Sequence, residues 1–159
     1  MTDTYWVGDR VVPSSETEYF GIELSSIASR DCYARAGITD PFKQIQVAEI
    51  YDPYTVMNPI QLEALGFCAP GKAVRYEDDG MWDIDSGGVA VCPSGGTLCS
   101  NPIAISGLAR CIDAADQVMG TAGGIQVKDV HNAICTSNGG IFQFHNITIF
   151  GDDHVEQLK

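Results

Sequence analysis

The chain has 159 residues, 45% of them hydrophobic and 19% charged. This composition is typical of a globular protein with a hydrophobic core, and the length predicts a single domain over residues 1–159. Its net charge of −12 argues against nucleic acid or an anionic membrane as a partner. No hydrophobic run is long enough to cross a bilayer. Six cysteines, with no signal peptide and no C-x-x-C pair, favour a reducing cytoplasm over a disulfide scaffold or a zinc site.

The first third of the chain predicts a strand followed by a helix. Residues 4–12 have the composition of a strand, and Pro13 interrupts it. Ser15 or Thr17 can cap a helix whose hydrophobic positions follow at helical spacing. Gly37 is expected to end this helix.

The middle of the chain predicts a buried strand and a second helix. Asp40-Pro41 is typical of a turn, and the apolar run at 45–50 indicates a buried strand. Residues 51–66 are then expected to form a helix, and 71–91 a loop and hairpin. The acidic run at 77–85 does not have the spacing of an EF-hand, so it predicts a solvated loop rather than a calcium site.

A turn between a strand and a helix is expected near residue 95. Residues 89–92 end a buried strand, and two glycines follow. Asn101 suits the N-cap of a helix over 102–120, with proline at its first position. Such a turn can gather polar groups and amide donors as an active site needs, although the local pattern alone favours a well-made turn without chemistry.

The end of the chain predicts two paired strands. Residues 131–135 and 141–150 are expected to form them, with TSNGG at 136–140 as the turn. The alternation of strands and helices along the whole chain indicates an α/β fold.

Three stretches, in this order, resemble one known family. VAEIYDPYTVMNPIQLEALGFCAPGKA (47–73) is similar to VAELHDAFTxNELLxYEALGLCxxGE, and CPSGG with SNPIAISG (92–107) is similar to NPSGG…GHPxGxTG. HNAICTSNGGIFQF (131–144) stands where that family has a Cys or His before a glycine turn and the last strand. The chain therefore resembles the C-terminal domain of the thiolase superfamily, in the lipid-transfer (sterol-carrier-type) branch. The resemblance implies the C-terminal half of a thiolase-like fold, a mixed sheet covered by helices.

The resemblance implies three catalytic residues, Cys135, Tyr51 and Asn101. Cys135 stands at the acid/base position of the family, a task for which the pKa of its thiol would have to be lowered; a buried strand cysteine without chemistry is the alternative. Tyr51 replaces the histidine of HDAF, and tyrosine suits hydrogen bonding or acid catalysis better than base catalysis. Asn101 replaces the GHP histidine that activates the nucleophile, and asparagine does not titrate near neutral pH.

A substrate-binding set is expected around these residues: Cys99, Tyr54, Asn58, Gly95, Gly96, Gly139 and Gly140. For Cys99 the pattern favours an inert loop thiol, and Tyr54 and Asn58 can equally serve packing. We expect the catalytic side chains to converge on one pocket that opens toward a partner. A coenzyme A thioester is the implied substrate, and no bound cofactor or metal is expected.

The implied function is Claisen-type cleavage or formation of a carbon–carbon bond in an acyl-CoA. The nucleophilic cysteine of the family lies in its N-terminal half, to which none of the three stretches corresponds. The implied partner is therefore a thiolase N-terminal half or a catalytic thiolase subunit, and a zinc-ribbon/OB-fold accessory protein is a further candidate. A partner would also supply the basic contacts that polyanionic coenzyme A needs.

Two alternatives stay open. A retro-aldol lyase subunit of the lipid-transfer branch would need no acyl-enzyme, and tyrosine at position 51 resembles that group. A non-catalytic thiolase-fold partner would stabilise a catalytic subunit. The absence of the GHP histidine favours the non-catalytic alternative, and Cys135 with the glycine turns favours an enzyme.

Overall fold

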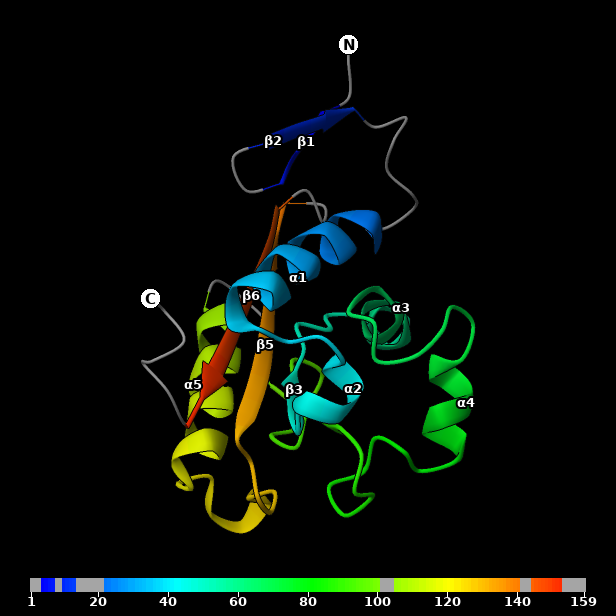
Figure 1. Cartoon of the computed structure of the whole chain (residues 1–159). Helices are drawn as coiled ribbons and strands as arrows, with labels where there is room; N and C mark the ends of the chain where they lie inside the picture. Colours follow the sequence, from blue (N-terminus) through cyan, green and yellow to red (C-terminus); the bar gives the residue numbers. More distant parts are fainter. Residues whose placement is uncertain (1–3, 8–9, 14–21, 101–104, 141–143, 153–159) are drawn as a thin grey trace.

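The centre of the molecule is a mixed sheet with the strand order β4–β3–β5–β6, shown by the computed structural model of the chain (Figure 1). β3 (Val47–Glu49) pairs in parallel with β4 (Ala90–Val91) and with β5 (Asn132–Gly139). β6 (Phe144–Gly151) runs antiparallel to β5. The structure describes residues 4–7, 10–13, 22–100, 105–140 and 144–152.

Strand β3 is buried on both faces of the sheet, as the largely apolar stretch 45–50 predicts. Val47 and Ala48 have no exposed surface. Successive side chains of a strand point to opposite faces. Val47 accordingly packs with Ala133 in one hydrophobic cluster, and Ala48 packs with Ile134 in the other.

Helices cover both faces of this sheet (Figure 1). α1 (Ile22–Ala36) and α3 (Met57–Ala64) contribute Tyr33 and Leu62 to the hydrophobic cluster on one face. α5 (Ser106–Met119) packs along β5 on the other face. The predicted α/β fold, a mixed sheet covered by helices, is therefore confirmed.

Glycine ends both long helices where the sequence predicts it. Gly37 and Gly120 follow α1 and α5 with φ angles of 70° and 72°, the left-handed conformation that glycine adopts without strain. The start of α5 was expected at Pro102, whereas the helix is described from Ser106. Asn101 and the rest of 101–104 lie outside the described residues.

The expectation of one strand over residues 4–12 is wrong. This segment contains two short strands, β1 (Thr4–Val7) and β2 (Arg10–Pro13), which form a separate antiparallel pair. Thr4 lies opposite Pro13 in this pair, so each short strand supplies the hydrogen-bonding partner of the other.

The expected loop and hairpin at 71–91 contains a helix, α4 (Ala73–Asp78). The indole Nε1 of Trp82 donates a hydrogen bond of 3.0 Å to the Ala73 carbonyl oxygen, and both residues are buried. This contact anchors the start of the acidic helix to the core. Two shorter elements complete the description, α2 (Pro41–Gln44) and the 3₁₀ turn η3 (Gly123–Ile125).

Two predicted boundaries move because pairing and packing extend or shorten an element. The helix expected from residue 51 begins at Met57, so the residues after β3 form a loop. The expected turn at 136–140 belongs largely to β5, because Thr136 to Gly139 pair with Ile147 to Phe144 of β6. Among the described residues, no helix combines the length and the hydrophobicity that a bilayer span requires.

Candidate active site

The loop after β3 is fixed at Tyr51 by buried side chains. The Tyr51 backbone N–H donates to Thr136 Oγ1 at 2.9 Å, and this hydroxyl donates to Gln61 Oε1 at 2.9 Å. The Gln61 side-chain amide then donates to the Tyr51 carbonyl oxygen. Gln61 and Thr136 are buried, so the network holds Tyr51 at the carboxyl end of β3, beside β5.

Asp52 connects this loop to the glycine turn after β4. Its Oδ1 accepts a hydrogen bond of 3.0 Å from the Thr97 backbone N–H, and its Oδ2 accepts one of 3.1 Å from Asn58 Nδ2. Asp52 is only 3% exposed. Two of the three stretches that carry the family resemblance, 47–73 and 92–107, therefore meet at one buried carboxylate.

The glycine turn itself has no room for side chains. Gly95 and Gly96 have φ angles of 91° and 63°. A Cβ on Gly96 would lie 3.1 Å from Asp52 Oδ1 and 3.2 Å from Cys92 Sγ, and one on Gly95 would lie 2.9 Å from Cys99 Cβ. The two glycines thus allow the turn to approach the loop that carries Tyr51 and Asp52.

A buried ion pair lies beneath this turn. Glu49 Oε2 is 3.4 Å from Arg110 Nη1, and it also accepts a hydrogen bond of 2.7 Å from the Ser94 hydroxyl. Burial raises the pKa of Glu49 to about 7, although the contacts with Ser94 and Arg110 act in the opposite direction. Arg110 Nη2 also pairs with Asp113 at 2.7 Å. This network connects β3, the glycine turn and α5.

A pocket of about 400 Å³ borders the same region. Asn58 lines this pocket and also donates to Asp52. Most of the lining is apolar, with Glu77 and Asp83 as exposed carboxylates. The full lining is Thr55, Asn58, Pro59, Leu62, Ala73, Val74, Glu77, Trp82, Asp83, Val91 and Leu98.

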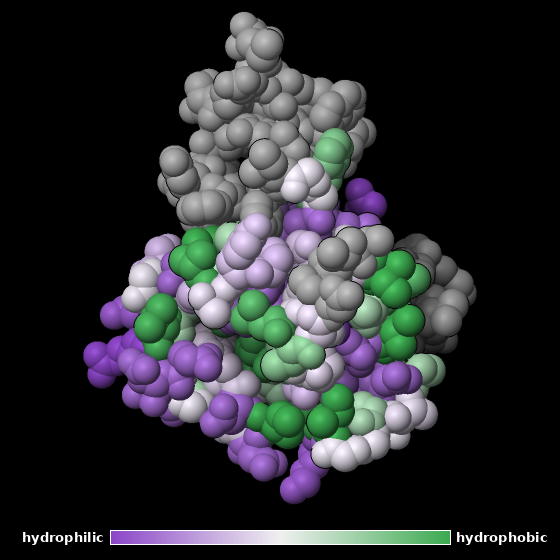
Figure 2. All heavy atoms as spheres, turned by 180° about the vertical axis from the view of Figure 1, so that it is seen from behind, coloured by the Kyte–Doolittle hydropathy of each residue, from purple (hydrophilic) through white to green (hydrophobic). Residues whose placement is uncertain are grey.

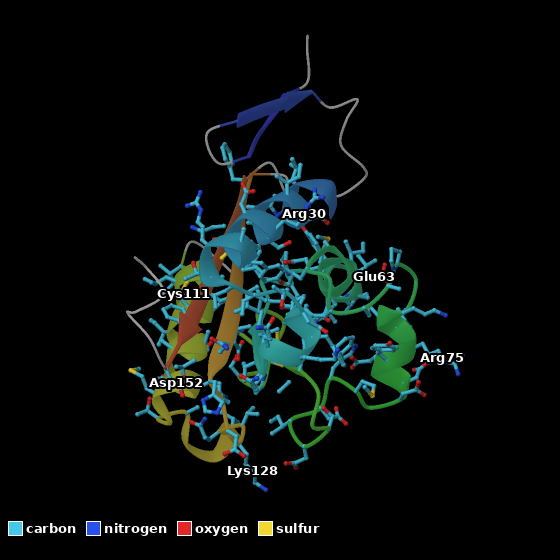
Figure 3. The ribbon with its side chains drawn as sticks, in the orientation of Figure 1. Arg30, Glu63, Arg75, Cys111, Lys128 and Asp152 are labelled. Carbon is cyan, nitrogen blue, oxygen red and sulfur yellow. The ribbon has the colours of Figure 1, made fainter. Side chains whose placement is uncertain are left out.

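Cys135 lies away from this pocket, within β5 and not at its end. Its register partner in β3 is Glu49, and its side chain is 1% exposed. Its Sγ is 3.1 Å from Cys111 Sγ on α5, where Figure 3 labels Cys111. Burial, with the neighbouring Cys111 as a second cause, raises the pKa of the Cys135 thiol well above its ordinary value.

The expected convergence of Cys135 and Tyr51 on one open pocket is therefore not what the structure shows. Strand alternation turns Cys135 to the α5 face, into a hydrophobic cluster with Val47 and Ala133. Cys135 is not among the pocket-lining residues. Asn101, the third member, lies outside the described residues. The catalytic roles of the three residues stay predictions.

The expected substrate-binding residues fall in two places. Asn58 lines the pocket. Tyr54 and Cys99 are exposed, and each is next in sequence to a pocket-lining residue, Thr55 and Leu98. Gly139 pairs with Phe144 at the far end of β5, and Gly140 follows with a φ of 63°. Among the described residues, no group of three or more Cys, His, Asp or Glu side chains is arranged to hold a metal ion.

The match to known proteins decides the family. Residues 12–152 match the family described as thiolase C-terminal domain-like. The chain belongs to this family. Human sterol carrier protein 2 is 36% identical to the chain over 116 residues, which are 72% of the chain and 20% of that protein. This similarity, with the structural one below, assigns the thiolase-like domain to the lipid-transfer branch.

The names of other similar proteins describe two kinds of reaction, acyl transfer and aldol chemistry. An acetyl-CoA acetyltransferase of Methanothermobacter thermautotrophicus is 30% identical over 120 residues, covering 75% of the chain and 30% of the relative. The solved structure of the "Ltp2-ChsH2(DUF35) aldolase" superposes with a TM-score of 0.73 at 31% identity, over 86% of this chain and 34% of the other. The chain thus spans between one fifth and about one third of the proteins it matches.

The sequence analysis does not single out several residues of the candidate site. Asp52, Gln61 and Thr136 carry the loop network, and Arg110 pairs with Glu49. A carboxylate inside the apolar run VAEI was one available signal, because a buried acid needs a partner. Nothing local indicates that the partner is an arginine 61 positions later.

Proposed function

We propose that the chain is the C-terminal half of a thiolase-like enzyme that forms or breaks a carbon–carbon bond next to the thioester of an acyl-CoA. The observation that carries the proposal is the junction at Asp52, which joins the Tyr51 loop to the glycine turn through a hydrogen bond of 3.0 Å from Thr97 and to α3 through one of 3.1 Å from Asn58. Both segments belong to the stretches on which the thiolase resemblance depends. A pocket of about 400 Å³ borders them.

In this proposal the pocket receives the acyl part of the substrate. Leu62, Trp82 and Val91 give it an apolar lining that suits a hydrocarbon group. Glu77 and Asp83 would repel the phosphates of coenzyme A. The nucleotide part is therefore expected to lie outside this pocket and to be held by basic groups of a partner.

The partner is a second thiolase-fold half, which supplies the nucleophilic cysteine where the reaction needs one. The net charge of −12 and the exposed hydrophobic residues of α5 support a requirement for a partner. The name of the similar aldolase structure joins Ltp2 with the DUF35 protein ChsH2. By analogy, we propose a zinc-ribbon/OB-fold accessory protein as an additional partner.

Tyr51 is the residue of this chain that we expect to act on the substrate. Its backbone is held on both sides by the Thr136 and Gln61 side chains, so the start of the loop is preorganised. A phenolic hydroxyl can donate a hydrogen bond to the thioester oxygen as negative charge develops there.

The position of Cys135 favours a retro-aldol lyase as the second candidate. Cys135 is a buried thiol with a raised pKa, which makes it a poor base at neutral pH. It is therefore poorly suited to the acid/base step of a thiolase. In a retro-aldol reaction, a base removes the proton of a 3-hydroxyl group. The Cα–Cβ bond then breaks, a carbonyl product leaves, and the thioester enolate takes a proton at Cα. The name of the similar structure, an aldolase, agrees with this chemistry.

The test is an assay of the chain co-purified with its partner on two substrates. Coenzyme A with a 3-oxoacyl-CoA measures thiolysis, and a 3-hydroxyacyl-CoA measures retro-aldol cleavage. Tyr51→Phe is expected to lower kcat by about 10²-fold, as for the loss of one oxyanion donor. Tyr76→Phe is the matched control, because Tyr76 belongs to the aromatic contacts of α4 with Phe42 and Trp82. Equal activity of the partner alone would show that this chain is a non-catalytic structural partner.

A further inference from the structure

The two cysteines on the α5 side of the sheet form a contact that the proposed function does not use. Cys111 Sγ on α5 and Cys135 Sγ on β5 are 3.1 Å apart, and both thiols are free. A disulfide bond is about 2.0 Å long, so closure requires the two sulfurs to approach by about 1 Å. All six cysteines lie in the part of the chain that the structure describes, and all are free.

The two thiols of this pair differ in their access to solvent. Cys111 is partly exposed, whereas Cys135 is 1% exposed beneath α5. A small oxidant can therefore reach Cys111 first. Cys135 then lies in position to react with the oxidised sulfur, because it is already in contact and need not diffuse.

We propose that Cys111 and Cys135 are a redox-modification site, which closes to an intramolecular disulfide when hydrogen peroxide oxidises Cys111. In the first step the Cys111 sulfur attacks the peroxide, the O–O bond breaks, and Cys111 becomes a sulfenic acid as water leaves. In the second step the Cys135 sulfur attacks the Cys111 sulfur, the S–O bond breaks, and a second water leaves. The two thiols lose two electrons and two protons in total, and the peroxide takes up both. An added dithiol reverses the reaction by thiol–disulfide exchange.

The surroundings of the pair restrict what else Cys135 can do. Its neighbours in the cluster include Val47, Ala114 and Ala133, which offer no reactive group. The polar side chains beside it are those of its register partners, Glu49 in β3 and Thr148 in β6, and neither contains sulfur. Burial beneath α5 shields Cys135 from direct attack by the oxidant and leaves the partly exposed Cys111 as the sulfur that is oxidised first. The disulfide would join the middle of α5 to the middle of β5, across the contact between helix and sheet. This proposal does not depend on the proposed enzymatic activity.

To test the proposal, the full chain is treated with hydrogen peroxide at a near-equimolar ratio, and the remaining thiols are then blocked by alkylation. Disulfide-linked peptides are identified by mass spectrometry without prior reduction. A linked peptide pair containing Cys111 and Cys135 is expected as the main product, reversible by dithiothreitol. Cys99→Ser is the matched control, because Cys99 is the exposed cysteine of the chain and its loss should not affect closure. Cys111→Ser and Cys135→Ser should each abolish the linked pair.

Two results would overturn the proposal. One is the finding of Cys111 in the sulfinic or sulfonic state together with an alkylated Cys135, since alkylation shows that the Cys135 thiol was still reduced. The other is a disulfide between a different pair of cysteines as the main product. Peptide mapping of the wild-type chain alone distinguishes these results, so the proposal stays testable even if the Cys135→Ser variant fails to fold.

Discussion

Glu49 and Arg110 form an ion pair in the interior, with 3.4 Å between Glu49 Oε2 and Arg110 Nη1 and side-chain exposures of 0% and 5%. Ser94 contacts both charges, since its hydroxyl donates to Glu49 at 2.7 Å and accepts from Arg110 at 3.1 Å. A strand, a turn and a helix are therefore held together by a single polar cluster inside an otherwise apolar layer. Such a cluster stabilises the fold only while every member has its partner.

The first prediction is that Glu49 makes stability fall as the pH rises. Its pKa is about 7 in the folded chain and 4.5 in an ordinary glutamate, because burial disfavours the charged form. Between these values the unfolded chain releases a proton that the folded chain keeps. The contribution of Glu49 is thus fully present below pH 4.5 and is lost through pH 7, by about 3 kcal/mol in total.

Urea unfolding of wild-type and Glu49→Gln chains across this range measures the effect. The difference between their free energies of unfolding should change by about 3 kcal/mol, because glutamine does not titrate. Asp113→Asn is the control: it removes the other partner of Arg110 and leaves Glu49 in place. Parallel curves for wild type and Glu49→Gln would contradict the prediction.

The second prediction concerns the contact of α5 with β5 at Gly107. Glycine-to-alanine exchange inside a helix normally stabilises it by about 1 kcal/mol. Here an added Cβ would lie 2.3 Å from Ser137 Cβ and 2.8 Å from its Oγ, so helix and sheet would have to separate. Gly107→Ala should therefore destabilise the chain by about 1–3 kcal/mol.

A double variant shows whether this crowding is the cause. Ser137→Gly removes both atoms that the new methyl group would meet first, and the next atom is 3.6 Å away. Gly107→Ala combined with Ser137→Gly should be more stable than the sum of the two single changes predicts. Strict additivity in thermal unfolding would mean that the two positions do not interact.

The predictions of helix ends and buried strands were most accurate where the structure depends on the properties of a few neighbouring residues. Gly37 and Gly120 end helices because glycine accepts a left-handed backbone whatever surrounds it. The apolar run of β3 predicts a strand buried on both faces, as found. The helix α4 was missed because its stability depends on Trp82 bonding back to Ala73, a contact between side chain and backbone that composition does not show.

The site was predicted only as far as the family motifs identify residues. The sequence singles out Tyr51 and the glycine turn, and the structure joins the residues that follow them, Asp52 and Thr97, by a hydrogen bond. Cys135 was expected at the end of a strand, but pairing with β6 extends β5 to Gly139 and leaves the thiol in mid-strand beside Cys111. Strand length here depends on pairing between distant segments, which the sequence pattern of one segment does not contain.

The third prediction separates backbone strain from crowding in the glycine turn. Gly96→Ala would add a methyl group 3.1 Å from Asp52 Oδ1 and 3.2 Å from Cys92 Cβ, at a φ of +63°. Gly71→Ala is the matched control, because Gly71 has a φ of +78° with nothing within 4 Å. The control should lose about 1 kcal/mol from strain alone. Gly96→Ala should lose more in urea unfolding, and equal losses would show that the turn tolerates the methyl group.

The last prediction concerns assembly through α5. Ile105, Leu108, Ile112 and Met119 follow one another at spacings of three, four and seven residues, and each is more than half exposed. This spacing places them along one side of the helix. Figure 2 shows hydrophobic side chains among polar ones on the face of the molecule opposite to the view of Figure 1. A hydrophobic stripe of this kind is typical of a surface that a partner covers.

We expect the chain to associate through this stripe, either with its partner half or, in isolation, with copies of itself. Leu108→Lys should weaken this association and leave the free energy of unfolding within about 0.5 kcal/mol, because the side chain is 61% exposed. Val74→Lys is the matched control: Val74 is also 61% exposed, but it lies on α4, and lysine there adds the same charge. Size-exclusion chromatography with light scattering measures the mass of each form. A wild-type chain that is a stable monomer and binds no partner, or equal behaviour of the two variants, would show that α5 is not the assembly surface.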